Sequence, residues 1–164
     1  MIPLIQGVSI TPITPVNVDE RGLTYEFWRD VLGRQVTYCE RKQGVVVGNH
    51  FHQGKDPSKD PERLMLLSGA LKMLVSNGRQ TLKTNLSREA ENRCYEITIH
   101  PGIVHAFLPC TPIQFLEYRS TIFNPQQSDT YPTDAFEAYL REQGMSIDRE
   151  ALSLYRSNIR GFIL

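Results

Sequence analysis

Apolar and polar residues alternate along most of the chain up to residue 123, in short runs that end at glycine, proline or asparagine. Alternation with a period of two places every second side chain on one face, which is typical of a half-buried β-strand. Many short strands with turn residues between them indicate an all-β sandwich or barrel. We therefore predict a barrel over about residues 5–123, with strands near residues 7–16, 23–28, 35–40, 44–52, 62–75, 80–84, 95–99, 103–107 and 113–123.

Turn and breaker residues refine this pattern at three places. Pro12 and Pro15 interrupt the first run, and proline cannot donate a ladder hydrogen bond, so this run predicts an edge strand or an arm. Asn77-Gly78 lies between two runs and predicts a hairpin with a type I′ turn. Residues 53–61 contain two Asp-Pro steps, a glycine and two lysines, which predicts a polar surface loop.

The pattern changes after residue 123, where helical spacing replaces alternation. Asp134 followed by Glu137 resembles a capping box, Gly144 would end that helix, and Asp148 could cap a second one. We expect helices between about residues 134 and 160, packed on the outside of the barrel or on a partner subunit through Leu152, Tyr155 and Ile159. This tail is too short to bury a core of its own, so residues 1–164 are predicted to form a single domain.

Composition narrows the range of partners. The 18 basic and 18 acidic residues balance and are interspersed, which argues against nucleic acid and against an anionic membrane surface as partners. The three cysteines form no CxxC pair, which favours free thiols in a reducing compartment. The N-terminus has neither a basic region nor a long apolar run, so we expect a cytoplasmic protein.

Two histidines separated by one residue supply the candidate chemistry. His50 and His52 end a β-branched run, and in a strand their side chains would point to the same side, about 7 Å apart at the backbone. An isolated His-x-His pair in a strand is often a hydrogen-bonded pair on the protein surface. Two ligands also hold a transition metal poorly, so a metal site would need more. Glu62 and His105 are the candidates for the remaining ligands. Three imidazoles and one carboxylate would suit one divalent zinc, iron, manganese, nickel or copper ion per chain.

The spacing of these residues resembles the cupin superfamily. Its first motif is matched by Gly44, five residues, His50-Phe51-His52, a gap, Glu62, six residues and Gly69. Its second motif ends in a glycine, two residues and a histidine, as Gly102-Ile103-Val104-His105 does. The gap before Glu62 is nine residues, which is longer than usual, and Pro109 replaces a common asparagine. The resemblance implies a double-stranded β-helix (a jelly-roll barrel) with these four residues as metal ligands.

Further segments are similar to the cupins of sugar-nucleotide pathways. These segments are residues 19–22, 48–52, 101–105, 123–125 and 129–131. They resemble the dTDP-keto-rhamnose epimerases and, more closely, the C-terminal epimerase domain of the capsular-polysaccharide assembling enzyme. That resemblance implies an epimerase or isomerase of a nucleotide-linked keto-deoxy sugar in polysaccharide biosynthesis, and a homodimer that exchanges N-terminal arms. Val47 stands where that family has an arginine, and valine cannot grip a phosphate.

Epimerisation beside a ketone needs an electrophile at the carbonyl oxygen and a base at the neighbouring C–H. The sequence offers Tyr118, Tyr38 and Glu117 as candidates for the base and does not choose among them. An iron ion at the same site could instead bind dioxygen, which would make the protein a cupin dioxygenase. A third alternative is a cupin that binds a sugar or another small molecule without catalysis.

The polarity of the pocket should distinguish these alternatives. A carbohydrate-like substrate needs a pocket lined by Arg, Asn, Gln and Tyr side chains, whereas a dioxygenase of small aromatic molecules needs an apolar one. Arg21, Asn49 and Gln114 are the candidate substrate-binding residues, and they favour a sugar.

Overall fold

The computed structural model describes residues 5–20, 22–28, 33–91 and 93–163. Their strands are β1 (Val8–Ile13), β2 (Asn17–Asp19), β3 (Gly22–Thr24), β4 (Gln35–Arg41), β5 (Val47–Phe51), β6 (Glu62–Ser68), β7 (Ala70–Ser76), β8 (Thr81–Ser87), β9 (Cys94–Ile99), β10 (Val104–Pro109), β11 (Ile113–Arg119) and β12 (Tyr131–Pro132). The helices are α1 (Arg88–Glu91), α2 (Phe136–Glu142) and α3 (Arg149–Ile163), with short 3-10 turns η1 (Pro57–Lys59), η2 (Pro125–Gln127) and η3 (Thr133–Ala135).

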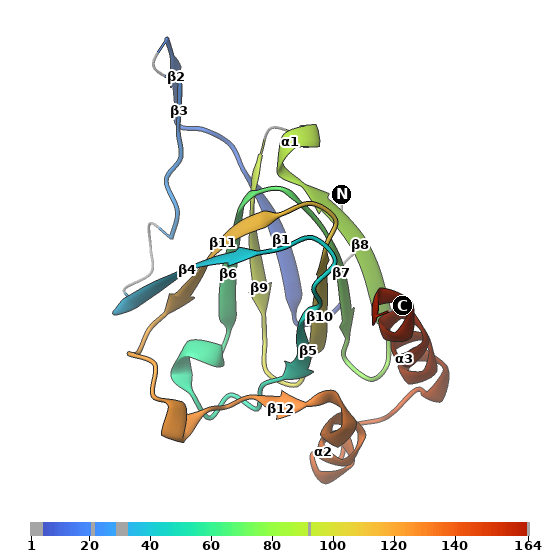
Figure 1. Cartoon of the computed structure of the whole chain (residues 1–164). Helices are drawn as coiled ribbons and strands as arrows, with labels where there is room; N and C mark the ends of the chain where they lie inside the picture. The colour runs from blue at the N-terminus through green and yellow to red at the C-terminus, as the bar shows by residue number, and fades with distance from the viewer. Residues whose placement is uncertain (1–4, 21, 29–32, 92, 164) are drawn as a thin grey trace.

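Ten of the described strands form two five-stranded sheets that face each other (Figure 1). The strand order is β1-β9-β6-β11-β4 in the first sheet and β12-β5-β10-β7-β8 in the second, and each described pair is antiparallel. Strands that are distant in the sequence are therefore neighbours, as in a jelly roll. The predicted all-β barrel with C-terminal helices is confirmed.

Alternating side chains fill the space between the two sheets. The main cluster of buried residues draws on both of them and includes Ile10, Leu66, Met73, Ile97 and Ile113. Burial of each such side chain stabilises the fold by about 1.5–3 kcal/mol relative to exposure. The apolar side chains predicted to lie inside a barrel therefore form its core, which holds the polar residues of the site in fixed positions.

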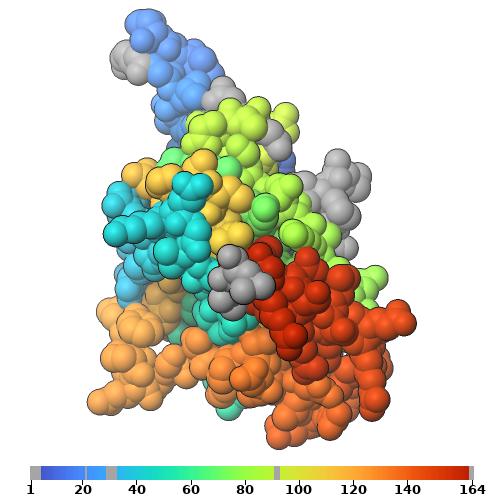
Figure 2. All heavy atoms as spheres, turned by 45° about the vertical axis from the view of Figure 1, so that its right-hand side comes forward, coloured from blue at the N-terminus to red at the C-terminus, as the bar shows by residue number. Residues whose placement is uncertain are grey.

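The first strand and the segment after it occupy the edge of the barrel. β1 lies at the edge of the first sheet, where Pro12 pairs with Tyr95 of β9, as the proline pattern predicted. β2 and β3 form a separate two-stranded hairpin that extends away from the barrel (Figures 1 and 2). Val18 and Leu23 on this hairpin are 66% and 42% exposed.

The C-terminal helices cover the outer face of the second sheet (Figures 1 and 2). Leu152, Tyr155 and Ile159 of α3 pack in a second buried cluster with residues of β5, β7 and β10. Asp148 caps α3, because its Oδ1 accepts hydrogen bonds from the backbone N–H groups of residues 150 and 151. The predicted capping box at Asp134 is wrong, because residues 133–135 form η3 and α2 begins without a side-chain cap.

Two loops also differ from their predictions. Ser76 pairs with Thr81, so the β7–β8 connection has four residues instead of a two-residue type I′ turn. Asn77 does not adopt a positive φ, and its Oδ1 instead accepts the backbone N–H groups of residues 79 and 80. Residues 53–61 are not wholly a surface loop, because Ser58 and Lys59 within it are buried.

No helix within the described residues is long and apolar enough to cross a membrane.

Candidate metal centre

A β-bulge in β5 sets the direction of the first histidine. The register between β5 and β10 shifts so that His50 lies opposite His105 while Gly48 lies opposite Ala106. Asn49 is therefore the extra residue of a bulge, and Gly48 and Asn49 adopt φ angles of 82° and 60°. A Cβ atom on Gly48 would lie 3.1 Å from the His105 carbonyl oxygen, so this position favours glycine on two grounds. The bulge brings the centroids of the His50 and His105 rings to 4.7 Å from each other.

Backbone carbonyl groups orient the other two histidine rings. His52 Nδ1 lies 2.5 Å from the carbonyl oxygen of Asp129, and His105 Nδ1 lies 3.1 Å from that of Ile103. Because a carbonyl oxygen only accepts, each Nδ1 carries the proton and donates it. This tautomer leaves the Nε2 lone pair of both rings available to a metal ion, as is usual for histidine ligands.

Glu62 approaches the histidines from the other sheet. It is the first residue of β6, and its Oε1 and Oε2 lie 3.4 Å from His52 Nε2 and 3.2 Å from His105 Nε2. Ligand atoms of His50, His52, Glu62 and His105 all lie within 4.8 Å of one another. Within the described part of the chain, His52 Nε2 and Glu62 Oε2 are buried without a hydrogen-bond partner. Buried polar atoms are rarely left so, and these two are donor atoms that a cation would satisfy.

The electrostatics of the group favour the protonation states that a metal requires. Burial, together with the neighbouring His105 and His52, lowers the pKa of His50 from 6.5 to about 3. Burial alone would raise the pKa of Glu62, but His105, His52 and Lys59 hold it well below its ordinary value. A neutral imidazole and an ionised carboxylate are the forms that bind metal ions.

A buried lysine completes the polar end of the site. Lys59, in η1, is 8% exposed, and its Nζ lies 2.5 Å from Glu62 Oε1 and 2.7 Å from Glu117 Oε1. Burial lowers the pKa of Lys59, but the two carboxylates outweigh burial and raise it above the ordinary value. Lys59 is therefore a permanent cation beside the candidate metal ligands.

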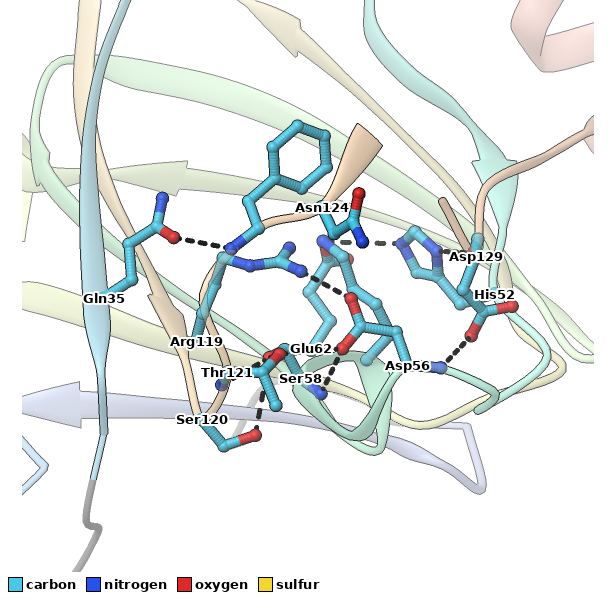
Figure 3. A network of polar contacts seen from close by, with 12 residues as sticks. Gln35, His52, Asp56, Ser58, Glu62, Arg119, Ser120, Thr121, Asn124 and Asp129 are labelled. Atoms are coloured by element: carbon cyan, nitrogen blue, oxygen red, sulfur yellow. Dashed lines mark hydrogen bonds and ion pairs between the residues drawn. The ribbon is translucent and has the colours of Figure 1, made fainter. Parts of the chain in front are cut away.

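A polar network holds the loop that carries Lys59 against the barrel, and Figure 3 shows Asp56, Arg119 and Asp129 of this network. Arg119, at the end of β11, is 3% exposed and binds Glu117 Oε1 at 3.1 Å and Asp56 Oδ2 at 2.5 Å. Asp129 accepts the backbone N–H groups of Gln53 and Asp56 at 3.0 Å and 3.2 Å. The loop between His52 and Glu62 is thus fixed from both sides, and this determines where its lysine points.

The four candidate ligands line one end of a cavity of about 190 Å³ inside the barrel, together with Lys59 and Glu117. Arg41 and Thr130 also contribute to its lining. The rest of the wall is mostly apolar and is formed by Val47, Leu64, Leu66, Leu71, Ile97, Phe107, Ile113 and Phe115. Arg41 lies over the Phe115 ring, with its guanidinium carbon 5.5 Å from the ring centroid. The cavity therefore offers a charged end for chemistry and an apolar wall for packing.

Comparison with known families identifies the group to which the chain is related. Residues 17–131 match the polysaccharide biosynthesis C-terminal domain family, and this match includes more than half of the chain. The chain belongs to this family. A comparison with curated protein sequences gives no significant match.

Solved structures of sugar-modifying enzymes share the fold of this polysaccharide biosynthesis domain. The 3'-monoepimerase ChmJ from Streptomyces bikiniensis, in complex with dTDP-quinovose, is 20% identical with a TM-score of 0.60, covering 77% of this chain and 71% of ChmJ. The sugar 3,4-ketoisomerase QdtA from Thermoanaerobacterium thermosaccharolyticum, in complex with TDP, is 14% identical with a TM-score of 0.66. The match covers 85% of this chain and 98% of QdtA. The dTDP-6-deoxy-D-glucose-3,5-epimerase RmlC from Legionella pneumophila is 20% identical with a TM-score of 0.57. The match covers 77% of this chain and 73% of RmlC.

In this family member, one of the three candidate bases lies in the cavity. Glu117 lines it, on the inward face of β11. Tyr118, the next residue, is on the opposite face and packs against Trp28 with ring centroids 5.2 Å apart. Tyr38 is 52% exposed, and its hydroxyl donates to Glu40. The expectation that Tyr38 or Tyr118 faces the reacting atoms is corrected, because adjacent strand residues point to opposite faces.

The candidate substrate-binding residues also lie elsewhere. Arg21 is outside the described residues. Asn49 belongs to the bulge, and its Oδ1 accepts a hydrogen bond from Thr133 Oγ1 at 2.9 Å, on the side of the C-terminal tail. Gln114 is exposed on the outer face of β11, where its amide contacts Ser68 and Glu40. Asn49 and Gln114 therefore do not line the cavity, contrary to expectation.

Sequence reasoning missed two cations that do line the cavity. Arg41 shares the inward face of β4 with Cys39. The alternating pattern shows that these two residues lie on the same face of the strand, but it does not say whether that face points inward or outward. Lys59 lies in a polar insertion that is typical of a surface loop. The one signal for its inward position is its proximity to Glu62, three residues later in the sequence.

Proposed function

We propose that this protein is a metal-dependent epimerase or isomerase of a keto-deoxy sugar. The observation that carries the proposal is the convergence of His50, His52, Glu62 and His105 at the charged end of the barrel cavity. Membership of the polysaccharide biosynthesis family supports a sugar substrate, and the epimerase and ketoisomerase structures with the same fold support the reaction class.

The four residues fit one divalent transition metal ion. The donor set of three imidazoles and one carboxylate is suited to zinc, iron, manganese or nickel. The unsatisfied Nε2 of His52 and Oε2 of Glu62 are the atoms that most need a cation. When bound, such an ion supplies a Lewis acid that polarises the ketone of the substrate.

Glu117 is the base that the cavity provides. Removal of a proton from the carbon beside the ketone breaks the C–H bond and moves the carbonyl π electrons onto oxygen. Lys59 and Arg119 both bind Oε1 of Glu117, so the second carboxylate oxygen is left to take that proton. Return of a proton to the opposite face of the carbon would complete an epimerisation.

The cavity takes the reacting sugar and leaves any nucleotide outside. Its volume of about 190 Å³ is below the roughly 300–1,000 Å³ of a typical small-molecule site. Val47, which stands in place of the arginine of related domains, lines this cavity and offers no phosphate contact. The proposal therefore defines the substrate by its ketone and deoxy positions, and a nucleotide would contact residues beyond the cavity.

The apolar wall favours one second candidate. Eight apolar side chains line the cavity, whereas a carbohydrate site usually presents more hydrogen-bonding groups. A cupin dioxygenase that acts on a small apolar molecule would use the same metal ligands with iron. Oxygen consumption by the iron-loaded protein with small aromatic substrates would distinguish this activity from epimerisation.

The test measures proton exchange and metal content together. The purified protein should contain about one transition metal ion per chain and should incorporate solvent deuterium beside the ketone of TDP-4-keto-6-deoxyglucose, followed by NMR. Exchange should stop after chelation and return with added metal. His100→Ala is the matched control, because His100 is exposed in a turn and is outside the group of four ligands. Failure of the metal-loaded wild type to exchange would refute the proposed reaction, and absence of bound metal would refute its metal dependence.

A further inference from the structure

Lys59 is the one buried amino group that lines the cavity within the described residues. It comes from the nine-residue gap between His52 and Glu62, which is longer than in the cupin motif, so the motif itself does not supply it. The insertion folds inward at η1, where Ser58 and Lys59 are both buried. A lysine placed this deep needs compensating charge, because an isolated ammonium group is costly to bury.

The surrounding charges hold the ammonium group and leave it one donor. An ammonium group has three N–H donors, and the carboxylates of Glu62 and Glu117 engage two of them. Arg119 binds the same oxygen of Glu117, and Asp56 in turn binds Arg119, which fixes Glu117 from behind. The network therefore immobilises the nitrogen and leaves the third N–H for a group in the cavity.

We propose that Lys59 is a catalytic residue that donates a hydrogen bond to the ketone oxygen of the substrate. This inference rests on the proposed function and adds to it a second electrophile, supplied by the chain itself. When the C–H bond beside the ketone breaks, its electrons form the carbon–carbon double bond and negative charge collects on the former ketone oxygen. The proton moves to Glu117, and Lys59 keeps its own proton throughout. An oriented cation stabilises that charge at less cost than water does, because water must reorient as the charge develops.

Position also favours Lys59 over the other cations near the site. Arg119 binds Glu117 and Asp56 behind the cavity and is not among the residues that line it, and Arg41 lies over the Phe115 ring. Lys59 alone of the three contacts a candidate metal ligand, Glu62. Lys59 is therefore the cation placed to reach a ketone oxygen that binds in the cavity beside Glu62.

The test compares Lys59→Met with Lys55→Met. Lys55 belongs to the same loop but is exposed, and its Nζ contacts the Tyr131 hydroxyl. With TDP-4-keto-6-deoxyglucose, Lys59→Met should lower the solvent-exchange rate by about 100-fold or more, the usual loss for one oxyanion donor. Metal content measured by mass spectrometry should stay near one ion per chain. Lys55→Met should change neither quantity more than about twofold.

An exchange rate within about threefold of wild type overturns the inference, and so does a rate loss that follows a loss or gain of metal, because Lys59 would then act through Glu62. If Lys59→Met does not fold, nitrogen-15 NMR of the wild-type lysine ammonium groups decides. The Lys59 signal, assigned with the charge-preserving Lys59→Arg, should shift when the sugar binds, and an unshifted signal overturns the inference.

The two proposals can fail separately. If the wild type neither binds nor exchanges the sugar, the proposed function fails and the role of Lys59 fails with it. If the wild type exchanges the sugar and Lys59→Met exchanges it equally fast, only the role of Lys59 fails.

Discussion

Acidification of the metal-free protein should destabilise it through His50, and the structure gives the size of this effect. His50 is held neutral in the folded state because burial and the neighbouring His105 and His52 lower its pKa from 6.5 to about 3. The unfolded chain takes up the proton near pH 6.5, whereas the folded chain takes it up near pH 3. Between these values the unfolded state binds more protons, so the free energy of unfolding falls as the pH falls.

The magnitude follows from the difference between the two pKa values. The full difference corresponds to about 5 kcal/mol, which is lost by the time the pH reaches about 3. At pH 5 the loss from His50 is about 2 kcal/mol relative to pH 7.5. The pKa of Glu62 is held well below its ordinary value, so its own contribution to stability is lost only at lower pH. A comparison of pH 7.5 with pH 5 therefore leaves out the contribution of Glu62, and the comparison with His50→Gln isolates His50.

The assay is urea unfolding with a chelator present, at both pH values, for the wild type, His50→Gln and His100→Gln. Glutamine does not titrate, so His50→Gln should lose about 2 kcal/mol less than the wild type on acidification. His100→Gln should behave as the wild type does, because His100 is an exposed turn residue. Equal losses in the wild type and His50→Gln would show that His50 is protonated in the folded state, and the reasoning about a neutral ligand would be refuted.

Three other predictions concern ligands, the tail and assembly. His105→Ala removes one of four ligands, so bound metal after dialysis should fall at least tenfold while the melting temperature changes little; retention of metal would contradict the site. Thr133→Val and Thr81→Val each break hydrogen bonds between tail and barrel and should each cost about 1 kcal/mol in urea unfolding. Of these two variants, only Thr133→Val should weaken metal binding, by about tenfold in calorimetry. Equal metal affinities of Thr133→Val and the wild type would exclude this coupling between the tail and the metal site. We also expect a homodimer whose interface buries more than about 1,000 Å² of surface. Val18→Asp on the exposed hairpin should weaken this dimer, as measured by light scattering. A monomeric wild type would rule out the dimer.

The strand pattern predicted the barrel because alternation is a local property of the sequence. All four candidate ligands were also predicted from the sequence, but on two different grounds. His50 and His52 follow from alternation on one strand, whereas Glu62 and His105 required the resemblance to cupin motifs. Spacing alone does not say that β6 faces β5 and β10 across the barrel, and this pairing of sheets is what brings Glu62 to the histidines.

The sequence did not indicate which face of each strand points into the barrel, and this was the main information that it lacked. Glu117 and Tyr118 are adjacent, so one of them must face the cavity, and alternation alone cannot say which. The answer depends on a distant contact, because Trp28 covers the outer face of β11 and packs on Tyr118. Lys59 illustrates a second limit. A polar insertion with two Asp-Pro steps is typical of solvent-exposed loops, and its burial depends on Glu62, Glu117 and Arg119, which lie outside the loop.

The bulge at Asn49 explains why the C-terminal tail matters to a site that it does not line. A regular strand would give Asn49 the face opposite to His50 with an ordinary φ, but the bulge holds it at a φ of 60°. Thr133 Oγ1 contacts both the carbonyl oxygen and the side-chain oxygen of Asn49, at 2.7 Å and 2.9 Å. Tyr155 of α3 adds a longer contact of 3.5 Å to the same side-chain oxygen. A positive φ in a non-glycine residue persists only where its surroundings compensate for it. The tail supplies that compensation one residue before His50, so the direction of the His50 side chain depends on residues more than 80 positions away in the sequence.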